Sequence, residues 1–312
     1  MQGTGGSHTP VLVNEVVKLL VLHDAGLYID CTFGGGGHAR AILQRLGRRG
    51  RLVVIDRDPA AVLAAEQLAA EDPRVQVARS SFALLEQLAH AAAIAGQVDG
   101  ILFDLGVSSP QLDDSRRGFS FGHDGPLDMR MDNESGFTAA QWIAAVSTRD
   151  LAEVIRAYGE ERFATRIARA IVREQALAPI TTTKRLAEIV ARAKPVWEKN
   201  LHPATRCFQA LRIVINDELD ELKLGLRQAV KVLRSGGRLV VISFHSLEDR
   251  IVKRFIRDES QGRSTPRSLP PRVAAEGLTL KRVCGPMKPT VDEIARNPRA
   301  RSATLRVAEK LL

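Results

Sequence analysis

Residues 27–104 alternate short apolar runs with segments of helical periodicity, and this alternation constrains the fold more than any other feature of the chain. The runs are 27–31 (LYIDC), 51–55 (RLVVI), 74–78 (RVQVA) and 98–103 (VDGILF). Between them, apolar residues recur at steps of three and four, as they do on one face of a helix. Strands that alternate with helices form βαβ units, so a mostly parallel sheet is predicted.

Glycines or carboxylates directly follow three of these predicted strands. The glycines at 34–37 come after the first strand, Asp56 after the second and Asp104 after the fourth. Ligands of parallel α/β sheets bind outside the carboxyl ends of the strands. We therefore expect a binding site at this edge of the sheet.

The glycine cluster fits a nucleotide-binding pattern. Gly34-x-Gly36-x-x-Ala39 matches GxGxx[G/A], and Asp56 lies 20 residues beyond Gly36. Such glycines let the backbone approach a ligand closely, and the acid accepts hydrogen bonds from ribose hydroxyls. The pattern serves NAD(P) enzymes and S-adenosylmethionine methyltransferases alike, and a tight strand-to-helix turn without a ligand is a third interpretation.

The loop after the fourth strand favours a methyltransferase. Residues 104–111 (DLGVSSPQ) offer a carboxylate, a turn and an amide where such an enzyme must hold the methyl acceptor. The alternative for Asp104 is a helix cap or a turn former.

The alternation stops after residue 104. Residues 105–135 are polar and predicted as a loop, and residues 137–194 carry helical periodicity only. Apolar residues between Phe208 and Leu233 then predict a single long amphipathic helix, ended by Ser235-Gly236-Gly237.

The sheet pattern returns in the last third of the chain. The predicted elements are a strand at 238–244, a helix at 247–257, a basic, proline-rich loop at 261–272, and strands at 279–283 and 302–307. We therefore predict a discontinuous α/β domain of residues 1–112 and 205–312, interrupted by a loop and helical substrate domain at 113–204.

The charge balance favours an acidic partner. Lysine plus arginine number 45 against 36 aspartate plus glutamate, a net charge of +9. Nucleic acid is the first expectation, and a merely Ala- and Arg-rich composition is the alternative. Aromatic residues are only 4% of the chain, which argues against a stacking platform for single strands.

Other sequence features exclude several classes of protein. Cys31, Cys207 and Cys284 form no CxxC, and the seven histidines form no HExxH, so we expect reduced thiols and no metal. No apolar run reaches the roughly 18–20 residues of a membrane span, and the first ten residues do not look like a secretion signal. We expect a cytoplasmic protein without a membrane partner; the oligomeric state is left open.

Eight longer motifs carry a family resemblance. They lie at residues 32–38, 55–58, 104–113, 125–132, 158–162, 202–206, 243–250 and 297–302. In this order they closely resemble the bacterial ribosomal RNA small-subunit methyltransferase H family, also called MraW. The resemblance runs from about His8 to Glu309.

The resemblance implies a class I (Rossmann-like) methyltransferase with a seven-stranded, mostly parallel sheet and an inserted all-helical domain. It implies methylation of the exocyclic N4 of a cytidine, cytidine 1402, in 16S rRNA of the small ribosomal subunit. The S-adenosyl-L-methionine contacts that it implies are Gly36, Gly37, His38, Asp56, Phe82, Asp104 and Gln111. The alternative for Phe82 is a plain core phenylalanine. An NAD(P)-dependent oxidoreductase and a catalytically silent RNA-binding protein are the alternatives.

The cytosine amine is a poor nucleophile, so catalysis is expected to rest on positioning and on a hydrogen-bond acceptor that faces the amine. Asp104 is the first candidate for that acceptor. Asp113, Asp128 and Asp132 are second choices. For His38 we expect a backbone contact at the helix start, with its side chain near the methionine end of the cofactor.

Several residues are candidates for RNA contact. Phe119 and Phe121 are expected either to stack on a cytidine turned out of its helix or to anchor their loop. The remaining candidates are His245 at a strand end, the helical group Arg206, Gln209 and Arg212, and the basic residues Lys281, Arg282, Arg296, Arg299 and Arg301. Each of these can instead be a satisfied or solvated polar residue. The expected substrate is the assembled small subunit.

Overall fold

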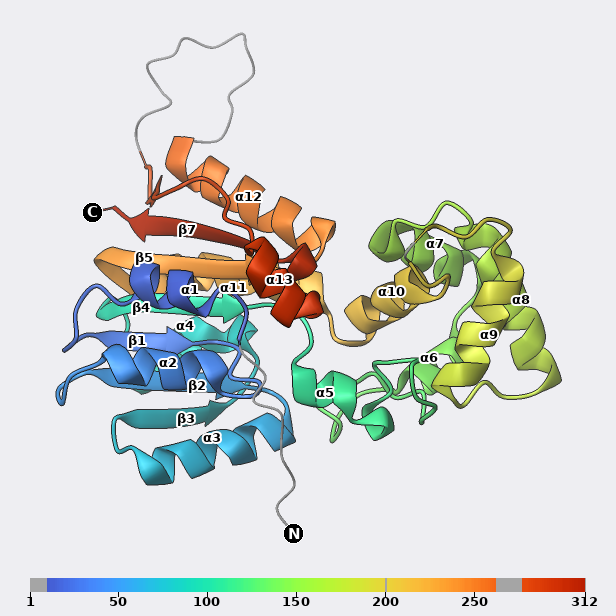
Figure 1. The fold of residues 1–312 in the computed structure, drawn as a ribbon, viewed down its shortest axis with the longest axis horizontal. Coiled ribbons are helices and arrows are strands. Elements are labelled where there is room, and N and C mark those ends of the chain that lie inside the picture. The colour runs from blue at the N-terminus through green and yellow to red at the C-terminus, as the bar shows by residue number, and fades with distance from the viewer. Residues whose placement is uncertain (1–9, 200, 262–276, 312) are drawn as a thin grey trace, which may run out of the picture. The chain divides into compact units, whose positions relative to one another are not determined.

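The computed structural model describes residues 10–199, 201–261 and 277–311 (Figure 1). The chain forms two compact units, Met1–Gly106 with Leu219–Leu312, and Val107–Glu218. Nearly all of the predicted proline-rich loop at 261–272 lies outside the described residues. Among those that are described, no helix is long and apolar enough to cross a membrane.

The first unit is built on a seven-stranded sheet of order β3-β2-β1-β4-β5-β7-β6. The strands are β1 (Leu27–Asp30), β2 (Arg51–Asp56), β3 (Val75–Arg79), β4 (Val98–Asp104), β5 (Leu233–Ser243), β6 (Leu280–Arg282) and β7 (Thr304–Lys310). Strands β1 to β5 pair in parallel, while β7 runs antiparallel to both β5 and β6. The predicted class I, mostly parallel sheet is confirmed.

Helices cover both faces of this sheet (Figure 1). One core contains α1 (Val13–Leu20), α2 (Gly37–Arg45) and α3 (Pro59–Glu71), and the other α4 (Leu85–Ala91), α11 (Glu218–Val232) and α12 (Ser246–Gln261). Neighbouring residues such as Leu102 and Phe103 enter opposite cores. Burial on both faces is why the strands read as continuous apolar runs. The unit is completed by α13 (Val291–Arg296) and the 3₁₀ turns η1 (Phe82–Leu84) and η4 (Pro298–Ser302).

The second unit is helical. It contains α5 (Ser109–Asp113), the 3₁₀ turn η2 (Ser115–Arg117), α6 (Ala139–Ala145), α7 (Thr148–Gly159), α8 (Ala164–Leu177), α9 (Thr183–Ala193) and α10 (Thr205–Ile215). Its own apolar core joins residues from α6 to α10 with Leu127, Met129 and Met131 of the preceding loop. An inserted helical part was predicted, and it is present.

The predicted long helix between Phe208 and Leu233 is wrong, because the structure has two helices, α10 and α11. The chain turns at Asp217, whose φ of 50° lies in the left-handed region. Helix α10 buries Cys207, Phe208 and Leu211 in the core of the helical unit. Along the chain, the boundaries between the units therefore fall at 106/107 and 218/219, not at the predicted 112/113 and 204/205.

The glycines that were expected to end the long helix also lie elsewhere. Helix α11 ends at Val232, and Ser235-Gly236-Gly237 belongs to the first half of β5. Gly236 has a φ of 76°, and a Cβ on Gly237 would lie 2.9 Å from the carbonyl oxygen of Val98. Gly237 therefore allows the close approach of β5 to β4, while Gly236 adopts a left-handed conformation that favours glycine.

Candidate functional site

The order of the strands reverses between β1 and β4, which is where ligands bind in doubly wound sheets. Three carboxylates stand at this edge, because Asp30, Asp56 and Asp104 end β1, β2 and β4. The hydroxyl of Thr32 accepts a hydrogen bond of 2.7 Å from the backbone N–H of Asp104. Thr32 therefore ties the loop after β1 to the end of β4.

The glycine cluster turns the chain from β1 into α2. Gly34 and Gly36 have φ values of 53° and 75°, and a Cβ on Gly36 would lie 2.6 Å from the ring of Phe33. Gly36 caps α2, so the amino end of the helix, with its partial positive charge, faces the loop. Such an end is suited to a carboxylate or phosphate.

Asp56 organises the glycine loop. Its Oδ2 accepts a bond of 2.8 Å from the N–H of Gly34, and its Oδ1 accepts one of 2.9 Å from the N–H of Asp58. Burial raises the pKa of Asp56, and these backbone bonds oppose the rise. Each carboxylate oxygen has a second acceptor site, so Asp56 can also receive hydroxyl groups of a ligand.

His38 is buried and lies between two acceptors. Its Nε2 is 2.9 Å from the carbonyl oxygen of Val11, and its Nδ1 is 3.3 Å from Oδ2 of Asp104. A neutral imidazole has one N–H and can donate to only one of them, whereas the protonated ring serves both. Burial lowers the pKa of His38, but the negative charges of Asp104 and Asp30 and the two hydrogen bonds outweigh it, so the pKa is raised.

Two buried oxygens at this edge have no hydrogen-bond partner among the described residues: Oδ1 of Asp104 and Oδ2 of Asp30. Buried polar atoms are normally paired, so each marks a place for a ligand, a water or a proton. Burial raises the pKa of Asp30 to about 6, while the charge of His38 opposes this rise. The Asp104 side chain as a whole is a quarter exposed, whereas its Oδ1 is buried.

Phe82 begins η1, directly after β3. Its ring meets Phe103 edge-on, with centroids 5.4 Å apart. A Cβ on Gly225 would lie 2.8 Å from the Phe82 ring, so this ring lies flush against α11. Phe82 is only partly buried, so it keeps some accessible surface.

Gln111 and Asp113 belong to the helical unit. Gln111 is buried on α5, where its Oε1 accepts a 2.9 Å bond from the N–H of Ser108 in a capping box. Asp113 is exposed at the end of the same helix.

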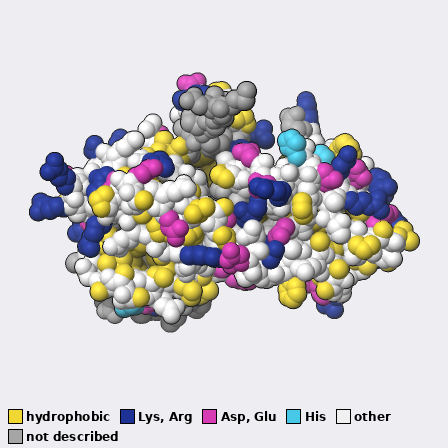
Figure 2. All heavy atoms as spheres, turned by 90° about the horizontal axis from the view of Figure 1, so that it is seen from below, with side chains coloured by type: hydrophobic (Ala, Val, Ile, Leu, Met, Phe, Trp, Pro, Cys, Tyr) yellow, Lys and Arg dark blue, Asp and Glu magenta, His cyan; other side chains and the backbone are white. Residues whose placement is uncertain are grey.

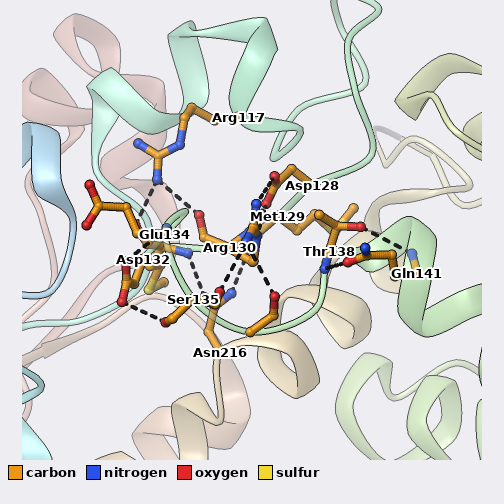
Figure 3. A network of polar contacts seen from close by, with 12 residues as sticks. Arg117, Asp128, Met129, Arg130, Asp132, Glu134, Ser135, Thr138, Gln141 and Asn216 are labelled. Atoms are coloured by element: carbon orange, nitrogen blue, oxygen red, sulfur yellow. Dashed lines mark hydrogen bonds and ion pairs between the residues drawn. The ribbon is translucent and has the colours of Figure 1, made fainter.

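Asp128 and Asp132 lie in a loop that is fixed by polar contacts (Figure 3). Both carboxylate oxygens of Asp128 accept bonds from Arg130, at 2.8 and 2.7 Å. Asp132 accepts bonds from the N–H of Glu134 and the hydroxyl of Ser135. Both carboxylates already accept hydrogen bonds from residues of their own loop, which favours Asp104 as the acceptor that faces the cytosine amine.

Phe119 and Phe121 pack within their own unit. Phe119 is 7% exposed and belongs to the helical core. Phe121 stacks on His202, with centroids 4.4 Å apart, and meets Phe208 edge-on at 4.9 Å. The contacts favour an anchoring role over a stacking one.

The polar group on α10 is engaged inside the helical unit. Arg206 donates to the carbonyl of Glu160 and to Glu198, and Gln209 donates to the carbonyl of Tyr158. Arg212 makes a bidentate pair with Glu218, with both bonds 2.7 Å long.

His245 follows β5 in the first unit. Its Nε2 lies 3.1 Å from Oε1 of Glu248, and the Oε2 of Glu248 accepts bonds from the N–H groups of Phe244 and His245. The remaining basic candidates are all exposed: Lys281, Arg282, Arg296, Arg299 and Arg301.

Sequence reasoning missed Asp30 as a member of the site. The signal was present, because a carboxylate at the end of an apolar strand is the pattern that singled out Asp56 and Asp104. Among the predicted contacts, the structure brings His38 and Asp104 together and joins the glycine loop to Asp56.

The residues at this edge fit S-adenosylmethionine. The amino end of α2 suits its carboxylate, Asp56 suits ribose hydroxyls and the Phe82 ring suits adenine. The unpartnered oxygen of Asp104 is the acceptor that an incoming amine needs.

Comparison with known proteins gives concordant matches. The model of the MraW methylase family matches residues 6–311. The ribosomal RNA small subunit methyltransferase H of Chromohalobacter salexigens is 55% identical over 305 residues, covering 97% of this chain and 92% of that protein. The protein of that name from Nitrosococcus oceani is 52% identical, covering 97% of each.

Solved structures are more distant. An rRNA methylase from Streptococcus thermophilus is 12% identical with a TM-score of 0.37, covering 96% of this chain and 94% of the other. An S-adenosylmethionine-dependent O-methyltransferase from Thermotoga maritima is 8% identical with a TM-score of 0.42, covering 96% and 64%.

Proposed function

The chain belongs to the MraW methylase family, and we propose that it transfers a methyl group from S-adenosylmethionine to the exocyclic N4 of cytidine 1402 in 16S rRNA. It is an S-adenosylmethionine-dependent rRNA methyltransferase. We also propose that the rRNA is methylated within the assembled small subunit and that the enzyme works in the cytoplasm.

One observation carries the chemistry: Oδ1 of Asp104 is buried and unpartnered among the described residues, at the edge where a ligand of this sheet binds. When bound there, the cofactor supplies an electrophilic methyl group on a sulfonium. Asp104 accepts a hydrogen bond from the cytosine amine, which localises the nitrogen lone pair and offsets the developing positive charge. Asp104 would then take up the proton that the amine releases as it gains the methyl group.

The other residues position these groups. His38 holds Oδ2 of Asp104 and leaves Oδ1 for the amine. Gly36, Gly37 and the backbone of His38 are assigned to the methionine end of the cofactor, Asp56 to its ribose and Phe82 to its adenine. Gln111 is assigned to the cofactor on the family motif alone.

The test is methyl transfer by the full chain. Methyl-labelled S-adenosylmethionine is incubated with small subunits that lack the modification, and the digested nucleosides are identified by mass. We expect N4-methylcytidine, and D220N, which alters an exposed carboxylate on α11, serves as the matched control for site variants. Cofactor binding without label would support a silent binder, and the absence of both would refute the proposal.

A further inference from the structure

The helical unit carries a cleft of about 590 Å³ that is lined largely by arginine. Arg166, Arg169 and Arg173 come from α8, and Arg192 comes from α9. We call these four residues and the space between them the arginine cleft. None of the residues assigned to the cofactor or to methyl transfer lines it.

The three arginines of α8 form a row. Residues 166, 169 and 173 are spaced by three and four, so they share one face of the helix. At 1.5 Å per residue the row is about 10 Å long. On the opposite face, Ile167 and Ile171 are fully buried in the helical core, so the row stands on a fixed base.

The positive charge of the row is not neutralised. Arg166, Arg169 and Arg173 are exposed and make no ion pair or hydrogen bond with any residue that the structure describes. Glu174 is the one carboxylate in the lining, and it lies 2.6 Å from Arg185 and 4.0 Å from Arg192. The cleft lining thus contains four arginines and one carboxylate, and that carboxylate already has arginine partners.

Lysine and arginine side chains also gather at the right-hand end of the surface in Figure 2, the end at which Figure 1 draws α8. Arg156 of α7 extends the basic surface, since its Nη2 donates a 2.9 Å bond to the hydroxyl of Thr165, which also lines the cleft.

A row of unneutralised guanidinium groups is suited to phosphates. The planar guanidinium binds phosphate oxygens through two parallel N–H···O bonds, and consecutive turns of α8 can meet consecutive phosphates of one strand. The arginines of α10 cannot do this as they stand, because Arg206 and Arg212 already donate to groups of the helical unit.

We propose that the arginine cleft binds the phosphate backbone of the substrate rRNA, through residues other than those assigned to methyl transfer. The inference rests on the proposed function for the identity of the RNA. Phosphate contacts position a protein on a nucleic acid without reading its sequence. The cleft therefore supplies affinity and register, while Asp104 and its neighbours supply the chemistry.

The test compares two triple variants of the full chain. R166Q/R169Q/R173Q removes the row. R45Q/R48Q/R49Q is the control and removes the same charge from three exposed arginines that precede β2. These three lie at the amino ends of the parallel strands, whereas the candidate site lies at the carboxyl ends. Binding to unmodified small subunits is measured over a range of salt concentrations. Each lost phosphate contact is expected to reduce the slope of log affinity against log salt by about 0.7–0.9.

The row variant should therefore lose about 2–3 from this slope and bind at least tenfold more weakly at low salt, with unchanged cofactor affinity. R166K/R169K/R173K keeps the charge and should retain most of the slope. Equal affinities and slopes for the row variant and the control variant would overturn the proposal. A variant weakened only toward an acidic polypeptide, such as polyglutamate, would also overturn it in favour of a protein partner.

The binding titration requires no turnover, so the two proposals fail separately. If the unaltered chain transfers no methyl group, the proposed function is refuted, and the phosphate contacts can still be measured by binding. Normal methyl transfer with an unchanged salt slope in the row variant would refute the arginine cleft alone.

Discussion

The ring of His38 contacts one oxygen of Asp104: its Nδ1 lies 3.3 Å from Oδ2, while its Nε2 lies 2.9 Å from the carbonyl oxygen of Val11. The hydroxyl of Thr32 accepts a hydrogen bond from the backbone N–H of Asp104, so both the backbone and the side chain of Asp104 are held in place. The other oxygen, Oδ1, keeps its acceptor capacity. This division of one carboxylate between a positioning contact and a substrate contact is the basis of the first prediction.

D104N should reduce kcat by about 10²- to 10⁴-fold, the usual worth of a positioned acid–base group, because the amide is a weaker acceptor without a charge. Cofactor affinity should change less than tenfold. Single-turnover methyl transfer and a cofactor-binding titration measure the two effects. Should D104N instead lose the cofactor and keep its rate at saturating cofactor, Asp104 would be a cofactor ligand and not the acceptor.

The buried carboxyl of Asp30 predicts a pH-dependent stability. Burial raises its pKa from the ordinary 3.8 to about 6, so the folded state holds the proton more tightly than the unfolded state. The stability that comes from the bound proton is therefore lost as the pH rises through 6, by about 1–1.5 kcal/mol between pH 5 and 7.5. The raised pKa of His38 acts in the same direction at higher pH.

D30N should remove the Asp30 part of this dependence, since its amide does not ionise and its oxygen can still accept the N–H of Thr32. Urea unfolding at several pH values measures it for D30N, the unaltered chain and the D220N control. Parallel stability curves for D30N and the unaltered chain would show that Asp30 has an ordinary pKa.

The sheet, its site edge and the inserted helices could be predicted because their signals are local. Apolar strands, glycines and terminal carboxylates are all readable within a few residues. The break between α10 and α11 could not be predicted, because apolar spacing continues through it without a glycine or proline.

Distant contacts make that break. Asn216 accepts a 2.7 Å bond from the N–H of Met131 and donates a 2.8 Å bond to the carbonyl of Met129, both more than 80 residues away (Figure 3). The pairing of Arg212 with Glu218 across the break was missed for the same reason. Sequence patterns report which residues face a core, but they do not report which distant polar groups meet.

A buried ion pair within the helical unit predicts a large loss of stability on substitution. Nζ of Lys194 lies 2.8 Å from Oε2 of Glu161, and the two side chains are 2% and 1% exposed. The N–H of Phe163 also donates to Glu161. K194M should destabilise the protein by about 3–5 kcal/mol, because it leaves a buried carboxylate without its counter-charge.

The double variant K194M/E161L should recover much of this loss, since apolar pairs often replace buried ion pairs without penalty. Urea denaturation of both variants measures the difference. The exposed pair of Lys223 and Asp220 provides the control, because K223M is expected to change stability by less than about 1 kcal/mol. A K194M variant as stable as K223M would contradict the prediction.

Phe121 is expected to act as an anchor of its loop, because its ring stacks on His202 and meets Phe208 within the same unit. F121A should lower stability by about 1–3 kcal/mol through lost burial and lost aromatic contacts. H202A should weaken the same contact, so a double-mutant cycle of the two should give a coupling of about 0.5–1.5 kcal/mol. At a temperature where F121A stays folded, KM for the small subunit should be unchanged. A tenfold rise in KM without a coupling to His202 would instead show that the ring meets the flipped nucleotide, because only a substrate contact weakens RNA binding while leaving the loop intact.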